Sequence, residues 1–494
     1  MTLPILSPLI ILLVVPLLAA KLILFGAPAR LTAIAGAAVN FLAFVVIVAF
    51  YNLGEGGYQF LSRLPVVPGL GISLAFGADG LSLAMLGLSS LVTLSAVAVA
   101  RTPERSPGLF YACLLFISAG AIGAFASTDT VFFYMFHELA LVPTFLLIGI
   151  FGSGDRQQAA WKITIYLALG SFVLLIGLIG LYLSLPPGAR TFEMREIVSM
   201  AQLGAFSGPD IVFLLLFVGF GILVSLFPFH TWAPAAYASA PSPAAMLHAG
   251  VMKKFGLYGL LRLVTPVFPE HIVERWSWLL LVLVAGNILY VGFVTITQKK
   301  LDLMLGHSSV MHMGYAFLGI LAWNGLGLSG AALTMVAHGL TIAALFALSG
   351  ELRERTGTLD FSDLGGLAQS MPRFGLLFGF AAMASVGLPG FAGFAAELMV
   401  FFGAFSAGSA SAATWNAYQM VTIIAVWGVV ISAVYMLRAY RKIFLGERPA
   451  RWESLPDLGT LSRAAVITLI VVLLVIGFWP PVALQFLTPP LLVP

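Results

Sequence analysis

Apolar runs of about twenty residues recur along the whole chain, and short polar segments separate them. A run of this length crosses roughly 30 Å of hydrocarbon when it forms an α-helix. The pattern therefore predicts an all-α, polytopic membrane protein with a single membrane domain over residues 1–494. We expect about fourteen transmembrane helices, near residues 3–24, 31–51, 80–100, 109–126, 129–151, 161–184, 210–230, 243–264, 277–297, 304–323, 328–349, 372–406, 417–443 and 463–485.

Two of the predicted helices are interrupted by proline and glycine. Gly387, Pro389 and Gly390 divide the twelfth helix, and the proline-rich stretch 227–243 follows the seventh. Broken helices at membrane depth are tolerated only inside protein or beside water, and a pair of them in corresponding positions points to a transport path. We therefore expect broken helices 7 and 12 to belong to two five-helix repeats. The predicted boundaries are about 109–264 and about 277–443, with flanking helices in 1–100 and 463–485.

Composition agrees with this class of protein. Apolar residues make up 60% of the chain and charged residues only 9%, which is too few to cover a soluble protein of this size. The basic residues lie in short loops and form no stripe, so we expect no nucleic-acid binding. Cys113 is the only cysteine, so the chain cannot build a cluster that needs about four thiolates. We expect no cofactor and no metal in this chain, and any redox chemistry belongs to a partner.

Loop charges predict the orientation. Lys21 follows the first apolar run and no basic residue precedes it, so we expect a retained first helix and no cleaved signal peptide. Successive loops alternate between many and few Lys and Arg residues. Loops that are rich in Lys and Arg usually lie on the inner side of the membrane, so we assign the richer set of loops to that side. That set contains Lys21, Arg30, Arg101, Arg105, Arg156, Lys162, Lys299, Lys300, Arg353, Arg355, Arg373, Arg438, Arg441, Lys442, Arg448, Arg451 and Arg463. The opposite loops contain Arg63, Arg190, Arg195, Arg262 and Arg275. Both termini are therefore expected on the outer side of a bacterial inner membrane.

Three charged residues fall inside predicted helices. Glu138, Lys254 and Glu397 each lie near the middle of an apolar run. A charge at this depth costs roughly 2.5 to 3.5 kcal/mol, and buried Glu and Lys change protonation when their partners change. They are candidate proton carriers; the alternative is that they form structural ion pairs between helices. Lys253 projects about 100° away from Lys254 on a helix, so we expect the two lysines to face different neighbours.

Histidines accompany these charges. His248, His307, His312 and His338 lie within or at the ends of apolar runs, and histidine titrates near neutrality. They could relay protons between the charged residues, or they could be hydrogen-bonded interhelical side chains. Their spacing does not indicate a pair of axial haem ligands. The segment Gly325–Gly330 fits a dinucleotide fingerprint but follows no strand, so we interpret it as a loop before a helix and expect no nucleotide there.

Several motifs in a fixed order carry a family resemblance. They are Gly77–Ser82, His137–Pro143, Pro228–Pro234, Ala249–Gly259, Ser308–Gly314, Ala337–Gly339 and Leu388–Glu397. Through them nearly the whole chain resembles the antiporter-like membrane subunit of respiratory complex I, of the subunit M or chain 4 type of NADH:quinone oxidoreductase.

The resemblance implies fourteen helices with two inverted five-helix repeats. It also implies that Glu138, Lys254 and Glu397 match the family's glutamate of helix 5, lysine of helix 8 and glutamate of helix 12, and that His312 and His338 match histidines of the central polar axis. The implied partners are other membrane subunits, homologous antiporter-like subunits among them, together with the bilayer and protons. Iron–sulfur clusters, flavin and quinone are expected in partner subunits.

The sequence departs from the family at defined positions. Leu223 occupies the position of the usual lysine of helix 7, which pairs with the glutamate of helix 5. His137 replaces a tryptophan, Tyr237 replaces a histidine, and Lys300–Leu303 replaces an acidic and basic motif after helix 9. Without a lysine at 223, Glu138 loses its expected cation and should be protonated more of the time. His137 and Lys162 are possible substitutes.

These observations predict a proton-translocating membrane subunit of a complex I-type NADH (or ferredoxin):quinone oxidoreductase, which contributes no redox centre to the enzyme. The proton-carrying residues are expected to be Glu138, Lys254, Glu397, His248, His312 and His338. Alternatives are a cation/proton antiporter subunit of the multisubunit, Mrp-like type, a membrane hydrogenase relative, and a structural paralog that does not pump.

Overall fold

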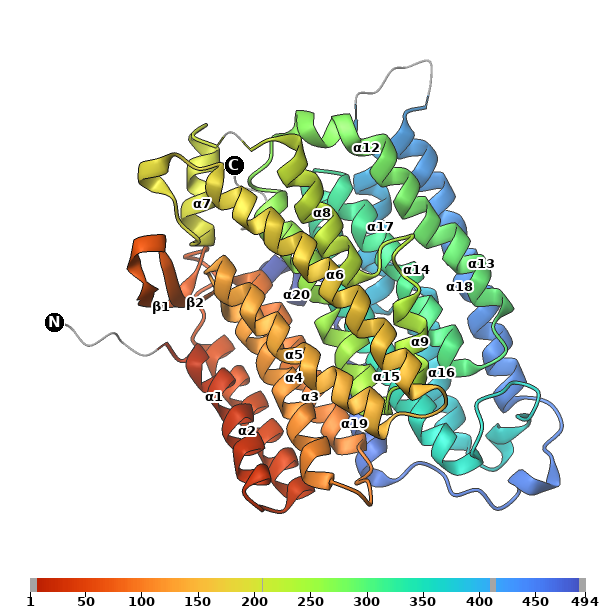
Figure 1. Ribbon diagram of the computed structural model, residues 1–494. Helices are drawn as coiled ribbons and strands as arrows, with labels where there is room; N and C mark the ends of the chain where they lie inside the picture. Colours follow the sequence, from red (N-terminus) through yellow and green to blue (C-terminus); the bar gives the residue numbers. More distant parts are fainter. Residues whose placement is uncertain (1–6, 207, 409–414, 488–494) are drawn as a thin grey trace.

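The computed structural model describes residues 7–206, 208–408 and 415–487, in which long helices pack side by side and a small sheet lies at one end (Figure 1). The N-terminal elements are α1 (Leu9–Leu24), α2 (Ala29–Ala49), β1 (Gln59–Val67), β2 (Ile72–Ala78) and α3 (Gly80–Val99). Next come α4 (Pro107–Ala126), α5 (Thr130–Phe151), α6 (Arg156–Leu183), α7 (Met194–Gln202), α8 (Asp210–Val224), α9 (Trp232–Ser239), α10 (Ser242–Leu247) and α11 (Lys254–Gly259). The remaining helices are α12 (Glu270–Ala285), α13 (Val291–Thr297), α14 (Leu301–Leu321), α15 (Gly325–Thr356), α16 (Pro372–Val386), α17 (Ala392–Phe405), α18 (Ala417–Phe444), α19 (Thr460–Phe478) and α20 (Pro481–Leu487). Segments of π-helix continue them at His248–Met252, Leu260–Val264 and Gly286–Tyr290.

Helices occupy every predicted span, as far as the described residues reach. Within those residues, nine helices are long and apolar enough to cross a membrane. They are Ala29–Ala49, Gly80–Val99, Pro107–Ala126, Thr130–Phe151, Arg156–Leu183, Glu270–Thr297, Gly325–Thr356, Ala417–Phe444 and Thr460–Phe478. The total of about fourteen crossings and the two repeats therefore stay predictions.

The two predicted breaks have a local cause. The seventh span ends at Val224, earlier than expected, because Ser225 adopts a left-handed φ of 76° and the chain turns away. The twelfth span divides into α16 and α17 at Gly387, whose φ of 78° favours a residue without a side chain. The loop predicted at Gly325–Gly330 is wrong, because α15 begins there and the side chain of Asn324 caps it by accepting from the Gly327 N–H.

A β-hairpin is the element that the all-α prediction missed. Strands β1 and β2 pair antiparallel, with Gln59 opposite Ala78 and Leu64 opposite Leu74. The hairpin lies near α7, at the end of the molecule opposite to the α1–α2 connection (Figure 1). The chain is therefore mainly α-helical with one two-stranded sheet among the described residues.

The centre of the bundle is formed by α15, α3 and α4. The most apolar stretch of α15 is completely buried, whereas only 22% of that of α2 is buried, so α2 faces the surroundings. Small residues let the central helices approach closely. A Cβ added to Gly339 of α15 would lie 2.7 Å from the carbonyl oxygen of Gly250. This close approach brings the segment before α11 against α15.

One buried ion pair ties the start of α3 to the end of the segment that follows α11. Asp79 caps α3 by accepting a hydrogen bond from the Ser82 N–H. Its carboxylate also accepts from both terminal nitrogens of the Arg262 guanidinium, with 2.5 Å between Nη1 and Oδ2. The rings of Tyr58 and Tyr258 lie 5.1 Å and 4.9 Å from that guanidinium. Arg262 is only 7% exposed, so its sequence assignment as a loop charge is wrong. It is a structural cation and says nothing about orientation.

Substitution of Arg262 by glutamine should destabilise the protein by about 3 to 5 kcal/mol, because Asp79 would keep a buried charge without its partner. Thermal unfolding of the detergent-solubilised protein measures this. Arg63→Gln, which breaks an exposed ion pair with Glu196, is the control and should change little. A small loss in Arg262→Gln, or no recovery on adding Asp79→Asn, would contradict the assignment.

Candidate functional site

Lys254 is completely buried at the start of α11. Its Nζ lies 2.6 Å from the carbonyl oxygen of Ala249 and 2.8 Å from Nδ1 of His338 on α15. An ammonium group only donates, so a charged Lys254 requires an unprotonated Nδ1 on His338. The contact is therefore a hydrogen bond along which a proton can move from lysine to histidine.

Lys253 faces another neighbour, as its position on the helix predicts. Its Nζ donates to Oγ of Ser309 on α14 at 3.2 Å and lies 5.6 Å from the centre of the Tyr237 ring. Both lysines are at most 1% exposed. Of the two amines, that of Lys254 alone hydrogen-bonds to a histidine ring within the described residues, so the two lysines differ in what they can pass a proton to.

His312 on α14 lies beside His338, with 5.8 Å between the ring centres. Its Nδ1 is 2.8 Å from the carbonyl oxygen of Ser308, and its Nε2 is 2.9 Å from that of Ser385 in the last turn of α16. Only the doubly protonated ring can donate to both carbonyls, and the C-terminal end of a helix favours a cation. A positive charge on Lys254, whose Nζ contacts the neighbouring ring of His338, repels that cation. The protonation of His312 is therefore coupled to the charge of Lys254 through His338.

Glu397 completes this group from α17, where it is 8% exposed. It lines a small cavity of about 20 Å³ together with His312 and His338. A cavity of this size holds about one water molecule. Nε2 of His338 has no protein partner among the described residues, which suits a bridging water. The Glu397 carboxylate packs against Gly387, where an added Cβ would lie 2.5 Å from Oε2. The break between α16 and α17 thus makes room for the carboxylate.

Glu138 on α5 lies apart from this group. Its Oε1 accepts from Oγ of Ser171 on α6 at 2.5 Å and lies 3.4 Å from Nδ1 of His137. Its side chain is 33% exposed. Leu223 packs against Gly170, the residue before Ser171, where an added Cβ would meet its Cδ2 at 3.1 Å. Among the described residues, Glu138 therefore has a hydroxyl and an imidazole beside it and no ion pair with a lysine or arginine.

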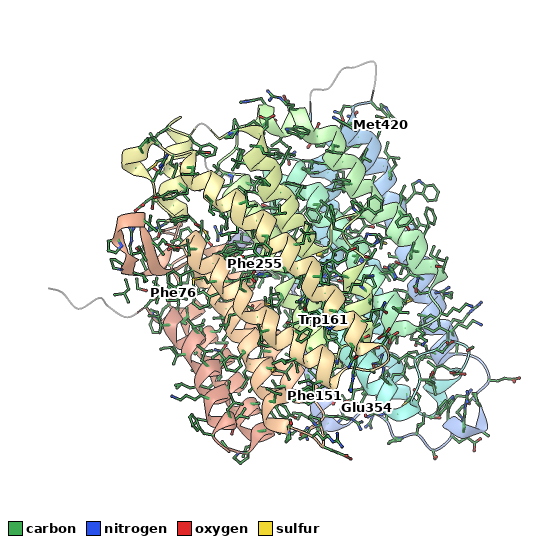
Figure 2. The ribbon with its side chains drawn as sticks, in the orientation of Figure 1. Phe76, Phe151, Trp161, Phe255, Glu354 and Met420 are labelled. Carbon is green, nitrogen blue, oxygen red and sulfur yellow. The ribbon has the colours of Figure 1, made fainter. Side chains whose placement is uncertain are left out.

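Of the two possible substitutes for that cation, the structure places only His137 next to Glu138. Lys162 lies near the start of α6, about 13 Å along the helix axis from Ser171. It lines a cavity with Asp302 and Arg353 instead. The ring of His137 stacks on Phe255 with 4.1 Å between centres, and Phe255 lies among the packed helices (Figure 2).

Neither His248 nor His307 lines the cavity that His312, His338 and Glu397 share. Nδ1 of His248 is 3.4 Å from the hydroxyl of Tyr237, which lines an open cavity of about 500 Å³ with Asp302, Glu351 and Arg353. Nδ1 of His307 is buried and has no partner in the part of the chain that the structure describes. From the sequence, Tyr237 is identified only as a departure from the family pattern; its contact with His248 is seen only in the folded chain. In the described ranges, no group of three or more His, Cys, Asp or Glu could hold a metal ion.

Comparisons with known proteins identify the family and the fold of the chain. Residues 127–421 match the family model described as NADH:quinone oxidoreductase/Mrp antiporter, transmembrane. The chain is 36% identical over 470 residues to NAD(P)H-quinone oxidoreductase chain 4 2 of Thermosynechococcus vestitus, covering 93% of this chain and 85% of that relative. It is 34% identical over 464 residues to NAD(P)H-quinone oxidoreductase chain 4 of Gloeobacter violaceus, covering 92% and 86%.

Two solved structures share the fold. A chain of respiratory complex I from Thermus thermophilus with bound NADH matches with a TM-score of 0.87 and 29% identity, over 98% of each chain. A chain of the Mrp complex from Dietzia sp. DQ12-45-1b matches with a TM-score of 0.82 and 24% identity, over 98% of this chain and 96% of that one, which shows the fold alone. The chain therefore belongs to the family of NADH:quinone oxidoreductase and Mrp antiporter membrane subunits, and its curated relatives are of the chain 4 type.

Proposed function

We propose that this chain moves protons across the membrane as the chain 4-type subunit of a complex I-type NADH (or ferredoxin):quinone oxidoreductase. The observation that carries the proposal is the contact of 2.8 Å between Nζ of Lys254 and Nδ1 of His338 in a fully buried region. Family membership and the similarity to chain 4 of NAD(P)H-quinone oxidoreductases support it. The redox centres, with their iron–sulfur clusters, flavin and quinone, belong to partner subunits.

Proton transfer begins at the lysine. Lys254 passes a proton to Nδ1 of His338 along their hydrogen bond, which leaves a neutral amine and a cationic ring. The cationic ring then gives up its Nε2 proton, through a water molecule in the shared cavity, to the carboxylate of Glu397, which leaves a neutral ring and a neutral carboxyl group. A water molecule there would join these groups within hydrogen-bond reach. Each transfer changes the charge that its neighbours face, so a remote event that shifts one charge can drive the next step.

Protons enter from the inner side of the membrane. The cavity of about 500 Å³ lined by Tyr237 opens to the surroundings, and the Tyr237 hydroxyl reaches His248. Tyr237 and His248 would carry protons from this cavity towards the two lysines. Glu138, with the buried Ser171 and His137, forms a separate and partly exposed site through which a neighbouring membrane subunit would change the charge near Phe255.

The arrangement in the membrane follows from the same family. The chain is proposed to cross a bacterial inner membrane about fourteen times with both termini outside. Two inverted repeats, about 109–264 and about 277–443, would each contribute one broken helix. Partners are other membrane subunits of the complex, homologous antiporter-like subunits among them.

A second candidate is a subunit of a multisubunit cation/proton antiporter. The family model covers both kinds of protein, and the fold is shared with an Mrp complex. Such a chain would exchange a cation for protons without an electron donor. Co-purification with flavin- and iron–sulfur-containing subunits would exclude it.

Lys254→Met should abolish the proton transfer of this subunit, because methionine keeps the volume but cannot hold a proton. Lys253→Met is a matched control, since it removes an equally buried charge that does not contact His338. The proton-to-electron ratio of the reconstituted complex measures both. Equal effects of the two variants would identify a structural cation, and an unchanged ratio in Lys254→Met would indicate a paralog that does not pump.

Leu223→Lys should restore a cation beside Glu138 and shift the pH dependence of pumping to lower pH, because a nearby positive charge favours the carboxylate. Leu223→Met keeps the volume and serves as the control. Proton pumping by the reconstituted complex is measured across a pH series. The same stoichiometry and pH profile in Leu223→Lys as in the wild type would count against a modified input site.

Gly387→Ala should slow pumping at least tenfold although Glu397 remains, because the new methyl group would enter the space of the carboxylate. Gly390→Ala is the matched control: its φ of 98° is also left-handed, but its added Cβ would meet Phe478. Pumping by both variants is compared at equal assembly of the complex. Similar losses would show that backbone strain alone explains the effect.

A further inference from the structure

An open hollow of about 470 Å³ adjoins the proposed entry cavity, with which it shares the lining residues Val99, Arg101, Thr102 and Glu351. Its walls come from the starts of α2 and α19 and from the ends of α3 and α15, and its charged lining residues are Arg30, Arg101, Glu351 and Arg355. The α1–α2, α3–α4 and α18–α19 connections lie at the same end of the bundle (Figure 1), where Figure 2 also shows Glu354. Loop charges predict that this end faces inward.

Three arginines but only one glutamate line the hollow. Arg355 is matched, because it pairs with Glu351 and donates to the carbonyl oxygens of Pro456 and Asp457. Arg101 is 55% exposed at its side chain and has only longer contacts, 3.8 Å to Glu351 and 3.4 Å to Glu354.

Arg30 is the unexplained charge. Its exposed side chain has no ion-pair or hydrogen-bond partner among the described residues. It stands in the first turn of α2, where the helix dipole disfavours a cation. The N-cap residues of α2 and α19, Pro28 and Gly459, offer no side-chain acceptor, so the N–H groups of both first turns stay open. Two arginines and two uncapped helix starts thus surround one hollow.

Exposed apolar side chains border the same place. Leu31 follows Arg30 and is 68% exposed, and Leu461 of α19, next to the lining residue Ser462, is 43% exposed. In a membrane protein such side chains face acyl chains. A basic hollow at the inner surface with apolar neighbours has the make-up of a lipid headgroup site.

We infer that this hollow binds the phosphate of an anionic phospholipid, with Arg30 and Arg101 as its cationic ligands and the acyl chains along α2 and α19. Phosphate oxygens accept from guanidinium groups and from the open N–H groups of helix starts. The bound lipid would fasten the start of α2 to the start of α19 across the end of α3. Free inorganic phosphate shares the headgroup chemistry but lacks the chains.

Binding to the intact, detergent-purified complex tests this. After lipid removal, the complex is titrated with phosphatidylglycerol in mixed micelles, and native mass spectrometry counts the bound lipids. Arg30→Gln should weaken one site roughly fivefold, and Arg30→Lys should recover most of the loss. Arg441→Gln is the control, since Arg441 is exposed in the last turn of α18 and does not line the hollow.

Each possible result either supports or overturns the proposed lipid site. A loss in Arg30→Gln alone, together with weak binding of phosphatidylcholine, supports the site. Equal binding by wild type and Arg30→Gln, or an equal loss in Arg441→Gln, would overturn it. Displacement of phosphatidylglycerol by millimolar inorganic phosphate would also overturn it, because the hollow would then be a site for the free anion.

Discussion

The burial of ionisable side chains inside an apolar bundle is the constraint on which the rest of this structure depends. Lys254 and Glu397 would be costly in hydrocarbon, so each must lie where the protein supplies a polar neighbour. Gly250 and Gly339 let two chain segments approach closely enough for Lys254 to reach His338. The close packing of these glycines is therefore what places Lys254 in contact with His338.

Broken helices supply the second part of that arrangement. The left-handed Gly387 ends α16, and the last carbonyl groups of this helix become available to His312. The same glycine leaves space for the carboxylate of Glu397. A continuous helix would offer neither feature, since its carbonyl groups would be used internally. The break thus creates a place where the charge of a histidine and that of a carboxylate can depend on each other.

Hydropathy predicted the helical spans because length and apolar content determine what can cross a membrane. Glycine and proline predicted the breaks for steric reasons. The hairpin of β1 and β2 was missed because its strands are too short to cross a membrane and contain Pro65 and Gly77, residues that are more typical of loops than of strands. Arg262 was misassigned because its partner, Asp79, lies far away in the sequence. The buried charges were predicted individually, but their pairing needed the structure: nothing in the sequence alone joins Lys254 to His338 rather than to Glu138.

The central claim is that His338 accepts the proton of Lys254. His338→Gln tests it most directly, because glutamine can hydrogen-bond to Lys254 but does not titrate. The measurement is the number of protons translocated per electron pair by the reconstituted complex. The account predicts a lower number with electron transfer and assembly retained. The wild-type number in this variant would contradict it.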